Sequence, residues 1–526
     1  MSKDFEEVIY RPKTSWRVYF AVIFSSIGGL LFGYDQGVMS GILVMEHWID
    51  YFNNPNAVWR GFITSIYLLG AFVGGLIAGP ISERIGRKRS IMGATVIFWF
   101  GTSMQTGATN VDLLMAGRFF QGISIGMYSM NVTVYQSELS PAHLRGRAIS
   151  FQQFSIVFGI MVAFWIGYGC AYIQSDASWR VPLGIQLAPS VVLFFGCFIL
   201  PYSPRWLCSK GRTEEALQTL AKLHANGDIN DPYVRKEFDE IMEQIRYEER
   251  YAMKSYKEIF RSPSTRKRVF LAMGIQGMQQ WIGINAVLYY APFIFQSAGM
   301  TGTLPSLLAT GVNGIVCVIF TIPALLFIDK VGRRKTILGG SIGMGTSMLI
   351  AGALLKVYPY VEDGNNNTQA QYGAVAMMFI FSASFSTSWG PTGWIYPAEI
   401  FPNRARAKGT SLATATNYLM NFVIGEITPV MLDNIKYGTY FFFFATNVVC
   451  GLIVYFFYPE TKGLSLEEME ILFGEGSEEA EAIKAVAART YTDAEIPQDT
   501  GIKVSPTAQQ ASSSSSEEKA NEKAEI

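Results

Sequence analysis

Charged residues are scarce in this chain of 526 residues. Asp, Glu, Lys and Arg together make up 16% of it, whereas hydrophobic residues make up 50%. Because a soluble protein carries about a quarter charged residues, this composition predicts a membrane protein. The 42 basic and 42 acidic side chains give a formal net charge of zero, which argues against a nucleic-acid-binding surface.

Groups that carry chemistry in enzymes and metal sites are also few. The three histidines are scattered, and no pair of the five cysteines has metal-site spacing, nor do they suggest a disulfide framework. The sequence has no nucleophile–base set, Walker loop or zinc motif, so we expect no enzymatic activity, no metal and no cofactor. Gly122 and Gly126 lie in an apolar run, which favours helix packing over nucleotide binding. The polar segment before Trp16 is unlike a cleavable signal peptide.

Long apolar segments are abundant instead. Crossing a bilayer takes about 20 mostly apolar residues, and twelve segments qualify. Their approximate ranges are 17–43, 59–80, 90–107, 112–136, 147–173, 181–201, 267–297, 304–328, 336–356, 371–397, 408–432 and 437–458. Lys and Arg gather at the N-terminus and in alternate loops, which places both termini in the cytosol.

A glycosylation acceptor agrees with this topology. The sequence Asn366-Asn367-Thr368 falls in a loop that the charge pattern places outside the cell. The sequon and the charge pattern are independent observations, so we expect Asn366 to be glycosylated. A second match at Asn131 lies inside an apolar segment and is set aside.

The second half of the chain repeats motifs of the first after about 250 residues. Glu83-Arg84-x2-Arg87 recurs as Asp329-Lys330-x2-Arg333. Glu138-x2-Pro-x3-Arg145 recurs as Glu399-x2-Pro-x3-Arg406. The repeat predicts two six-helix halves in the same orientation, a design used by alternating-access transporters.

The repeated motifs place acids beside arginines on the cytosolic face. We interpret them as ion pairs that hold this face shut and release when it opens; the alternative is that they only fix the topology. The candidate cytosolic gate consists of Glu83, Arg84, Arg87, Glu138, Arg145, Asp329, Arg333, Glu399 and Arg406.

The chain is expected to divide into five parts. These are a cytosolic N-terminus (1–15), a first six-helix bundle (16–203), a helical cytosolic linker (204–266), a second six-helix bundle (267–458) and a cytosolic helix with a disordered tail (459–526). The linker is polar and charged, and Thr213 is expected to cap one of its helices. An amphipathic helix is expected at 464–473, before the Ser-rich tail.

Several amides interrupt the seventh apolar segment. Gln276, Gln279, Gln280 and Gly283 share one face of a regular helix. Asn285 lies off that face and can join the glutamines only if the helix bends or unwinds, which Gly283 permits. Amides donate and accept hydrogen bonds, as a neutral hydroxyl-rich ligand requires. They either bind such a ligand or hold neighbouring helices together.

Together these motifs resemble the sugar porter family of the major facilitator superfamily, most of all its fungal members. The resemblance covers about residues 16 to 470 and includes Gly117-Arg118-x3-Gly122 and Pro459-Glu460-Thr461-Lys462-Gly463. It implies an all-α membrane protein with twelve transmembrane helices in two pseudo-symmetric bundles, joined by short cytosolic helices. It also implies a plasma-membrane location and a monosaccharide substrate, such as glucose, another hexose or xylose.

The resemblance assigns roles to individual residues. Tyr289 and Tyr290 correspond to an outer gate. The residues that match sugar-binding positions of the family are Gln153, Gln279, Gln280, Asn285, Asn313, Phe385, Trp394 and Asn417. The sequence departs from the family where Tyr418 replaces a frequent tryptophan, Tyr202 replaces a glutamate, and Thr133 stands where proline is common.

Two charges lie inside apolar segments of the first half. Asp35 and Arg118 each cost roughly 2.5–3.5 kcal/mol at mid-membrane and are natural partners. In proton-coupled relatives an aspartate and an arginine at these positions couple transport to protons, so Asp35 is the expected proton acceptor and Arg118 its tuner. A static ion pair is the alternative. Glu426 is either a second proton site or a residue facing water near the outer mouth.

These features predict a proton–monosaccharide symporter. The alternatives are a passive hexose facilitator, a polyol or disaccharide transporter, and a sugar sensor, although the C-terminal tail of about 50 residues is short for a sensor. The expected partners are a sugar, protons and the lipid bilayer, with no nucleic acid, and the protein is expected to be monomeric.

Overall fold

The computed structural model describes residues 15–251, 256–360, 366–462, 469 and 472–473, apart from a few side chains inside helices. The chain divides into two compact units, Met1–Met469 and Glu470–Ile526. All the helices named below lie in the first unit. The amphipathic helix expected at 464–473 lies almost wholly outside the described residues.

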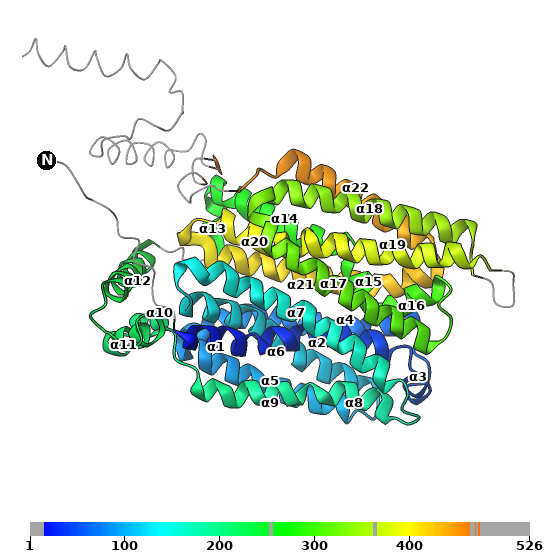
Figure 1. The fold of residues 1–526 in the computed structure, drawn as a ribbon, viewed down its shortest axis with the longest axis horizontal. Helices are drawn as coiled ribbons and strands as arrows, with labels where there is room; N and C mark the ends of the chain where they lie inside the picture. The colour runs from blue at the N-terminus through cyan, green and yellow to red at the C-terminus, as the bar shows by residue number, and fades with distance from the viewer. Residues whose placement is uncertain (1–14, 252–255, 361–365, 463–468, 470–471, 474–526) are drawn as a thin grey trace, which may run out of the picture. The chain divides into compact units, whose positions relative to one another are not determined.

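The first half of the chain forms a bundle of long helices (Figure 1). Its helices are α1 (Trp16–Ser25), α2 (Ile27–Ile42), α3 (Glu46–Tyr51), α4 (Ala57–Ile85), α5 (Arg87–Thr106), α6 (Val111–Leu139), α7 (Ala142–Cys170), α8 (Ala177–Ile185) and α9 (Leu187–Ile199). Helices α1 and α2 together form one expected membrane segment with a short break between them, and so do α8 and α9.

The second half forms a matching set of helices. They are α14 (Pro263–Trp281), α15 (Ile284–Tyr289), α16 (Ala291–Ser297), α17 (Thr303–Val331), α18 (Arg333–Val357), α19 (Thr368–Thr387), α20 (Trp389–Ile400), α21 (Asn403–Asn434) and α22 (Gly438–Phe457). Here α14–α16 together form one expected segment, and α19–α20 form another. The described residues are nearly all helical, and their helices account for the twelve expected membrane segments.

The hydropathy of single helices is a stricter measure of membrane crossing. Within the described part of the chain, seven spans are long and apolar enough by length and composition, among them Trp16–Ile42, Ala57–Ile85 and Thr303–Ala324. The other expected segments do not meet this measure. The segment that carries the glutamines of α14 is one of these.

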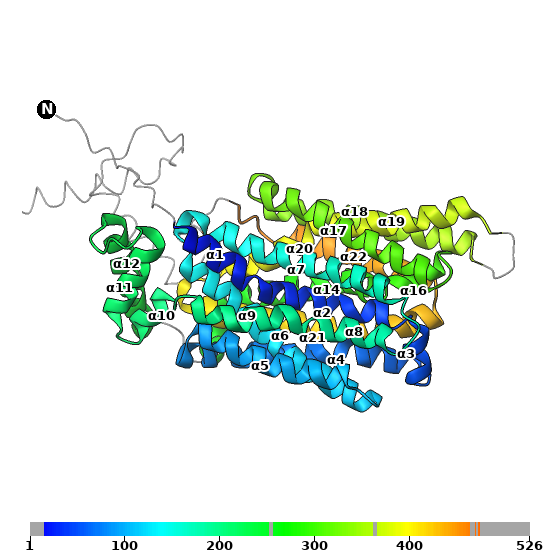
Figure 2. The ribbon, with the colours of Figure 1, turned by 60° about the horizontal axis from the view of Figure 1, so that its bottom comes forward.

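In the described part of the chain, four helices connect the two halves. They are α10 (Pro204–Ser209), α11 (Thr213–His224), α12 (Pro232–Tyr251) and α13 (Tyr256–Arg261). In Figures 1 and 2, α10–α12 gather beyond the ends of the long helices. The expected cap at Thr213 is wrong: Thr213 is the first helical residue, and Arg212 occupies the cap position without a side-chain bond.

Tyr202 lies just before α10, and its ring is surrounded by cations. Its ring stacks on Trp206, with 5.5 Å between the centroids. Lys88 Nζ lies 4.9 Å from its centroid, and the guanidinium carbons of Arg89 and Arg212 lie at 5.8 and 5.7 Å. The Tyr202 ring therefore attracts these cations by cation–π interaction.

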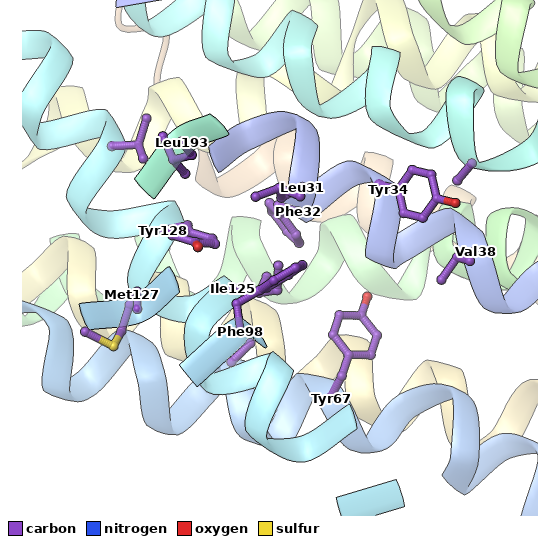
Figure 3. Close-up of a cluster of buried hydrophobic side chains, with 14 of the residues drawn as sticks. Leu31, Phe32, Tyr34, Val38, Tyr67, Phe98, Ile125, Met127, Tyr128 and Leu193 are labelled. Atoms are coloured by element: carbon purple, nitrogen blue, oxygen red, sulfur yellow. The ribbon is translucent and has the colours of Figure 1, made fainter. Parts of the chain in front are cut away.

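Large apolar side chains fill the first bundle. Leu31, Phe98, Ile125 and Tyr128 are almost completely buried in one continuous cluster. Figure 3 shows several of these side chains converging between α2, α5 and α6, with the ring of Tyr67 standing off α4 into the same region. Because this side of each helix is buried, the ion pair of Asp35 and Arg118 described below is shielded from bulk water.

Glycines allow α4 and α6 to touch through their backbones. A Cβ on Gly122 would lie 1.9 Å from the carbonyl oxygen of Tyr67, and one on Gly126 would lie 2.1 Å from that of Ala71. Such close approach is what small residues permit at helix interfaces. The glycines of this run therefore serve helix packing, as the sequence predicts.

Gly122→Ala should destabilise the fold by about 2 kcal/mol, because the added methyl group forces two helix backbones apart. The measurement is the thermal unfolding of the purified protein in detergent. Gly93→Ala is the matched control, since a Cβ at Gly93 meets nothing within 4 Å and a helical alanine is otherwise favourable. Equal stability of the two variants would contradict the packing role of Gly122.

Candidate functional site

An ion pair lies inside the first bundle. Arg118 on α6 places Nη1 3.7 Å from Oδ1 of Asp35 on α2, and both side chains are at most 1% exposed. Arg118 also donates from Nη2 to the carbonyl oxygen of Thr64 at 3.0 Å and lies 5.0 Å above the ring of Tyr67. The sequence-based prediction that these two charges are partners is consistent with this geometry.

The two members of the pair are held very differently. Arg118 donates to the carbonyl oxygen of Thr64 and lies over the ring of Tyr67. Neither carboxylate oxygen of Asp35 receives a hydrogen bond from the described residues. A buried carboxylate is stabilised mainly by such donors. Nε and Nη1 of Arg118 also lack a hydrogen bond among these residues. Arg118 therefore keeps one hydrogen bond and a ring contact, whereas Asp35 depends on the charge opposite it.

A cluster of amides joins α14 to α20 and α21 in the second half. Gln279 donates to the carbonyl oxygens of Trp389 and Gly390, at 2.8 and 3.2 Å. Asn417 donates to Oε1 of Gln276 at 2.5 Å and to Oε1 of Gln279 at 2.9 Å. The glutamine face expected on the seventh segment thus meets the asparagine expected on the eleventh.

A break at Gly283 brings Asn285 to this cluster. Helix α14 ends at Trp281, and Gly283 adopts φ +96°, a left-handed conformation that favours glycine. The chain then restarts as α15, and Asn285 donates from Nδ2 to Oε1 of Gln280. The bend that the sequence requires for these two amides to meet is present.

Asn313 adds an amide from α17. It is fully buried, and neither its Oδ1 nor its Nδ2 has a hydrogen-bond partner among the described residues. An unsatisfied buried polar group costs about 1–3 kcal/mol. Such a group is expected where a ligand supplies the missing partner.

Three other predicted sugar-binding residues lie on neighbouring helices. Gln153 is on α7, Phe385 on α19 and Trp394 on α20, and all three are only partly buried. The ring of Phe385 lies against Gly390, one of the residues whose carbonyl accepts from Gln279. The structure does not bring Gln153 or Trp394 into a hydrogen bond with the amide cluster.

Both tyrosines of the predicted outer gate are buried between the two halves. The hydroxyl of Tyr289 lies 2.7 Å from that of Tyr67 on α4 and donates to Asn421 at 3.1 Å. Tyr290 donates to the carbonyl oxygen of Gly425 at 2.7 Å. The bundle is therefore closed at this level by contacts between α4, α15 and α21.

The repeated acid–arginine motifs form equivalent ion pairs in the two halves. Arg87 binds Glu138 at 2.9 Å, and Arg333 binds Glu399 at 2.7 Å. Each acid also accepts from a hydroxyl: Glu138 from Ser203 at 2.5 Å and Glu399 from Thr461 at 2.8 Å. Each pair lies within a single half, so it braces helices of its own half in this conformation.

The remaining predicted gate residues are arranged differently. Glu83 and Arg84 are exposed, and the described residues give them no ion pair. Arg406 donates to the carbonyl oxygen of Phe401 at 3.3 Å. The side chains of Arg145 and Asp329 lie outside the described part. Asn366, the predicted glycosylation site, precedes Asn367, whose side chain caps α19.

Several polar contacts between the halves were not predicted from the sequence. Gln36 on α2 donates to Oδ1 of Asn285 at 2.6 Å. Tyr418 donates to the hydroxyl of Ser129 at 2.8 Å, and Ser65 donates to Glu426 at 3.3 Å. A polar residue in an apolar segment is the only signal the sequence offers for them, and it does not name the partner.

The chemistry of the site is that of neutral recognition. Amides and phenols supply donors and acceptors, and the charges of Asp35 and Arg118 face each other. Among the described residues, no group of three or more His, Cys, Asp or Glu side chains has a geometry able to hold a metal ion. The arrangement suits a hydroxyl-rich, uncharged molecule.

Comparisons with known proteins agree with this chemistry. The model of the family described as "Sugar (and other) transporter" matches residues 21–473. An MFS glucose transporter from Aspergillus flavus is 38% identical over 485 residues, covering 88% of this chain and 91% of that protein. A high-affinity glucose transporter from Kluyveromyces lactis is 36% identical over 468 residues, covering 86% of this chain and 85% of the relative.

Solved structures show the same fold. The proton:xylose symporter XylE bound to 6-bromo-6-deoxy-D-glucose aligns with a TM-score of 0.72 at 29% identity, over 88% of this chain and all of that chain. A partially occluded inward-open conformation of XylE from E. coli aligns with a TM-score of 0.73 at 28% identity, over 86% of this chain. The chain therefore belongs to the sugar transporter family of the major facilitator superfamily.

Proposed function

We propose that this protein carries a neutral monosaccharide, a hexose such as glucose, across the plasma membrane by alternating access, together with a proton. The observation that supports the sugar is the amide cluster of Gln276, Gln279, Gln280, Asn285 and Asn417, with the unpartnered Asn313 on α17. Sugar hydroxyls both donate and accept, so they can replace each amide–amide bond of the cluster as the ligand enters.

Among the described residues, no charged side chain forms a hydrogen bond to the amide cluster, which favours a sugar over an organic anion. The relatives include a quinate permease from Neurospora africana, 34% identical over 478 residues, and quinate carries a carboxylate. Holding a carboxylate usually takes an arginine, a lysine or a helix N-terminus. The buried arginine of the first bundle, Arg118, already faces Asp35, which supports a neutral substrate.

The coupling to protons is inferred from the buried carboxylate of Asp35, which accepts no hydrogen bond from the described residues. Protonation would remove the charge that attracts Arg118 and leave the arginine on its carbonyl and its ring. Movement of α2 relative to α6 would follow, because the pair joins these two helices. The structural neighbour described as a proton:xylose symporter supports this choice over a passive hexose facilitator, which remains the second candidate.

The contacts between the halves suggest how access alternates. We infer that Tyr289 and Tyr290 close the outer side in the conformation seen here, with Tyr67 as the partner on α4. The Arg87–Glu138 and Arg333–Glu399 pairs would brace the cytosolic ends of each half. Sugar moves inward when the cytosolic ends of the two bundles separate.

Asp35→Asn should abolish accumulation of sugar against its gradient, while exchange of sugar across the membrane continues. Asparagine fills the same space but carries no titratable proton, so the cycle can run without a driving proton. Radiolabelled hexose uptake in a transporter-null cell, with and without a protonophore, measures accumulation; counterflow in proteoliposomes measures exchange.

Glu426→Gln is the matched control for this experiment. It also neutralises an acid in an apolar segment, one that accepts from Ser65, and it should keep accumulation if Glu426 is not a proton site. Concentration of sugar by Asp35→Asn would rule out Asp35 as the coupling group. Absence of protonophore-sensitive accumulation in the unmodified protein would instead establish the passive facilitator.

Gly283→Ala should weaken hexose binding by about tenfold, because a side chain in the left-handed conformation strains the break by about 1–3 kcal/mol. The new Cβ would also lie 2.6 Å from the Phe443 ring. Relief of this strain turns α15 and separates Asn285 from Gln280. Equilibrium binding of the sugar to purified protein is the measurement, and Gly339→Ala, whose Cβ meets nothing within 4 Å, is the control.

Asn366→Gln should remove a glycan if the loop before α19 faces the outside. On expression in a fungal host, the unmodified protein should shift in gel mobility after endoglycosidase treatment, and the variant should not. Asn131→Gln should leave the shift unchanged, since Asn131 is 2% exposed inside α6 and donates to Ser90. A shift that survives Asn366→Gln would contradict the assigned topology.

A further inference from the structure

Asp35 and Gln36 are consecutive residues of α2 that face opposite partners. Successive side chains on an α-helix point about 100° apart. Asp35 faces Arg118 of α6 within the first bundle, at 3.7 Å. Gln36 faces the second bundle and donates from Nε2 to Oδ1 of Asn285 on α15, at 2.6 Å. One turn of α2 therefore carries both the candidate proton site and a direct contact to the candidate sugar site.

The contact continues into the amide cluster. Asn285 receives the bond from Gln36 on its oxygen and donates from its nitrogen to Oε1 of Gln280. The row Gln36–Asn285–Gln280 thus runs from the first half to the second without a break. A change in the position of Gln36 alters the orientation of Asn285, because the amide plane is fixed by a partner on each side.

The two ends of this row differ in how firmly the backbone holds them. Helix α2 is pressed against α7: a Cβ on Gly33 would lie 1.8 Å from the carbonyl oxygen of Ile156, and one on Gly37 would lie 3.0 Å from Cβ of Ala163. Helix α15 is a piece of six residues between Gly283 and Tyr290. Movement of α2 is therefore shared with α7, while α15 is the part that can turn in response.

Other titratable groups near Asp35 come from α4, α6 and α15. They are Arg118, the hydroxyl of Tyr67, and the hydroxyl of Tyr289, which lies 2.7 Å from that of Tyr67. None of them donates a hydrogen bond to the carboxylate of Asp35. Gln36 itself does not titrate, so its bond to Asn285 reports the position of α2 and not a charge of its own.

We propose that Gln36 is a positioning residue that relays the state of the Asp35–Arg118 pair to the sugar-binding amides through its hydrogen bond to Asn285. The proposal rests on the proton-coupled function proposed above. Protonation of Asp35 frees α2 from Arg118, α2 shifts with α7, and Gln36 reorients Asn285 for the sugar. Without the amide of Gln36, the Asp35–Arg118 pair and the sugar-binding amides persist, but the state of one no longer affects the other.

The test is Gln36→Leu, which keeps the bulk of the side chain and removes the donor. Counterflow of hexose in proteoliposomes at several pH values gives the KM for exchange, and an imposed proton gradient gives the accumulation ratio. In the unmodified protein KM should change with pH. In Gln36→Leu this pH-dependent change in KM should shrink by about fivefold, because one net hydrogen bond contributes about 1 kcal/mol. Accumulation should fall, while the exchange rate should stay the same.

Two further variants separate a relay from a structural role. Gln36→Asn keeps an amide, but its shorter side chain cannot reach Asn285, which Gln36 bonds at 2.6 Å. It should therefore behave as Gln36→Leu does, and it replaces the leucine variant if that variant fails to fold. Gln296→Leu removes a comparable part-buried glutamine bond, to Ser306 on α17, and should keep the pH dependence of KM and the accumulation ratio.

The outcomes distinguish the relay from the coupling itself. A pH-dependent KM and full accumulation in both Gln36 variants overturn the relay and leave the proposed coupling intact. A proportional loss of exchange rate and accumulation, with the pH dependence of KM unchanged, also overturns the relay, because it indicates a structural role. If the unmodified protein shows neither accumulation nor a pH-dependent KM, both proposals fall.

Discussion

Polar groups inside an apolar bundle persist only where other polar groups meet them, and the break at Gly283 is what allows this here. With an unbroken helix, Asn285 would face away from Gln276, Gln279 and Gln280. The left-handed glycine turns α15 back toward the cluster, so that Asn285 reaches Gln280 on one side and Gln36 on the other. The same short helix delivers Tyr289 to Tyr67. The Asn285–Gln280 bond, the Tyr67–Tyr289 contact and the Gln36–Asn285 bond all depend on this one backbone conformation.

Much of this could be predicted from the sequence, because the signals were local. Apolar length marked the membrane segments, and Gly122 and Gly126 marked a helix contact that the structure places against Tyr67 and Ala71 of α4. The bend at Gly283 followed from helical geometry alone, since the amides share no common face without it. The repeated acid–arginine motifs correctly indicated two equivalent constructions, one in each half.

The rest depends on partners that are distant in the sequence. Gln36 and Asn285 are 249 positions apart, and Tyr418 meets Ser129 across 289; only the docking of two complete bundles sets these pairs. The repeat predicted that acids pair with arginines, but it did not predict that Arg87–Glu138 and Arg333–Glu399 each lie within one half. Local signals can also mislead. Thr213 was expected to cap α11, but it is the first residue of the helix, and Arg212 occupies the cap position.

The contact between Tyr67 and Tyr289 joins two neutral phenols. A full elementary charge that crosses the membrane field changes energy by about 2.3 kcal/mol per 100 mV, but the separation of two uncharged hydroxyls moves no net charge. Opening of this contact is therefore electrically silent. Charge lies instead on the Asp35–Arg118 pair, so the membrane potential acts on residues other than the two that form this contact.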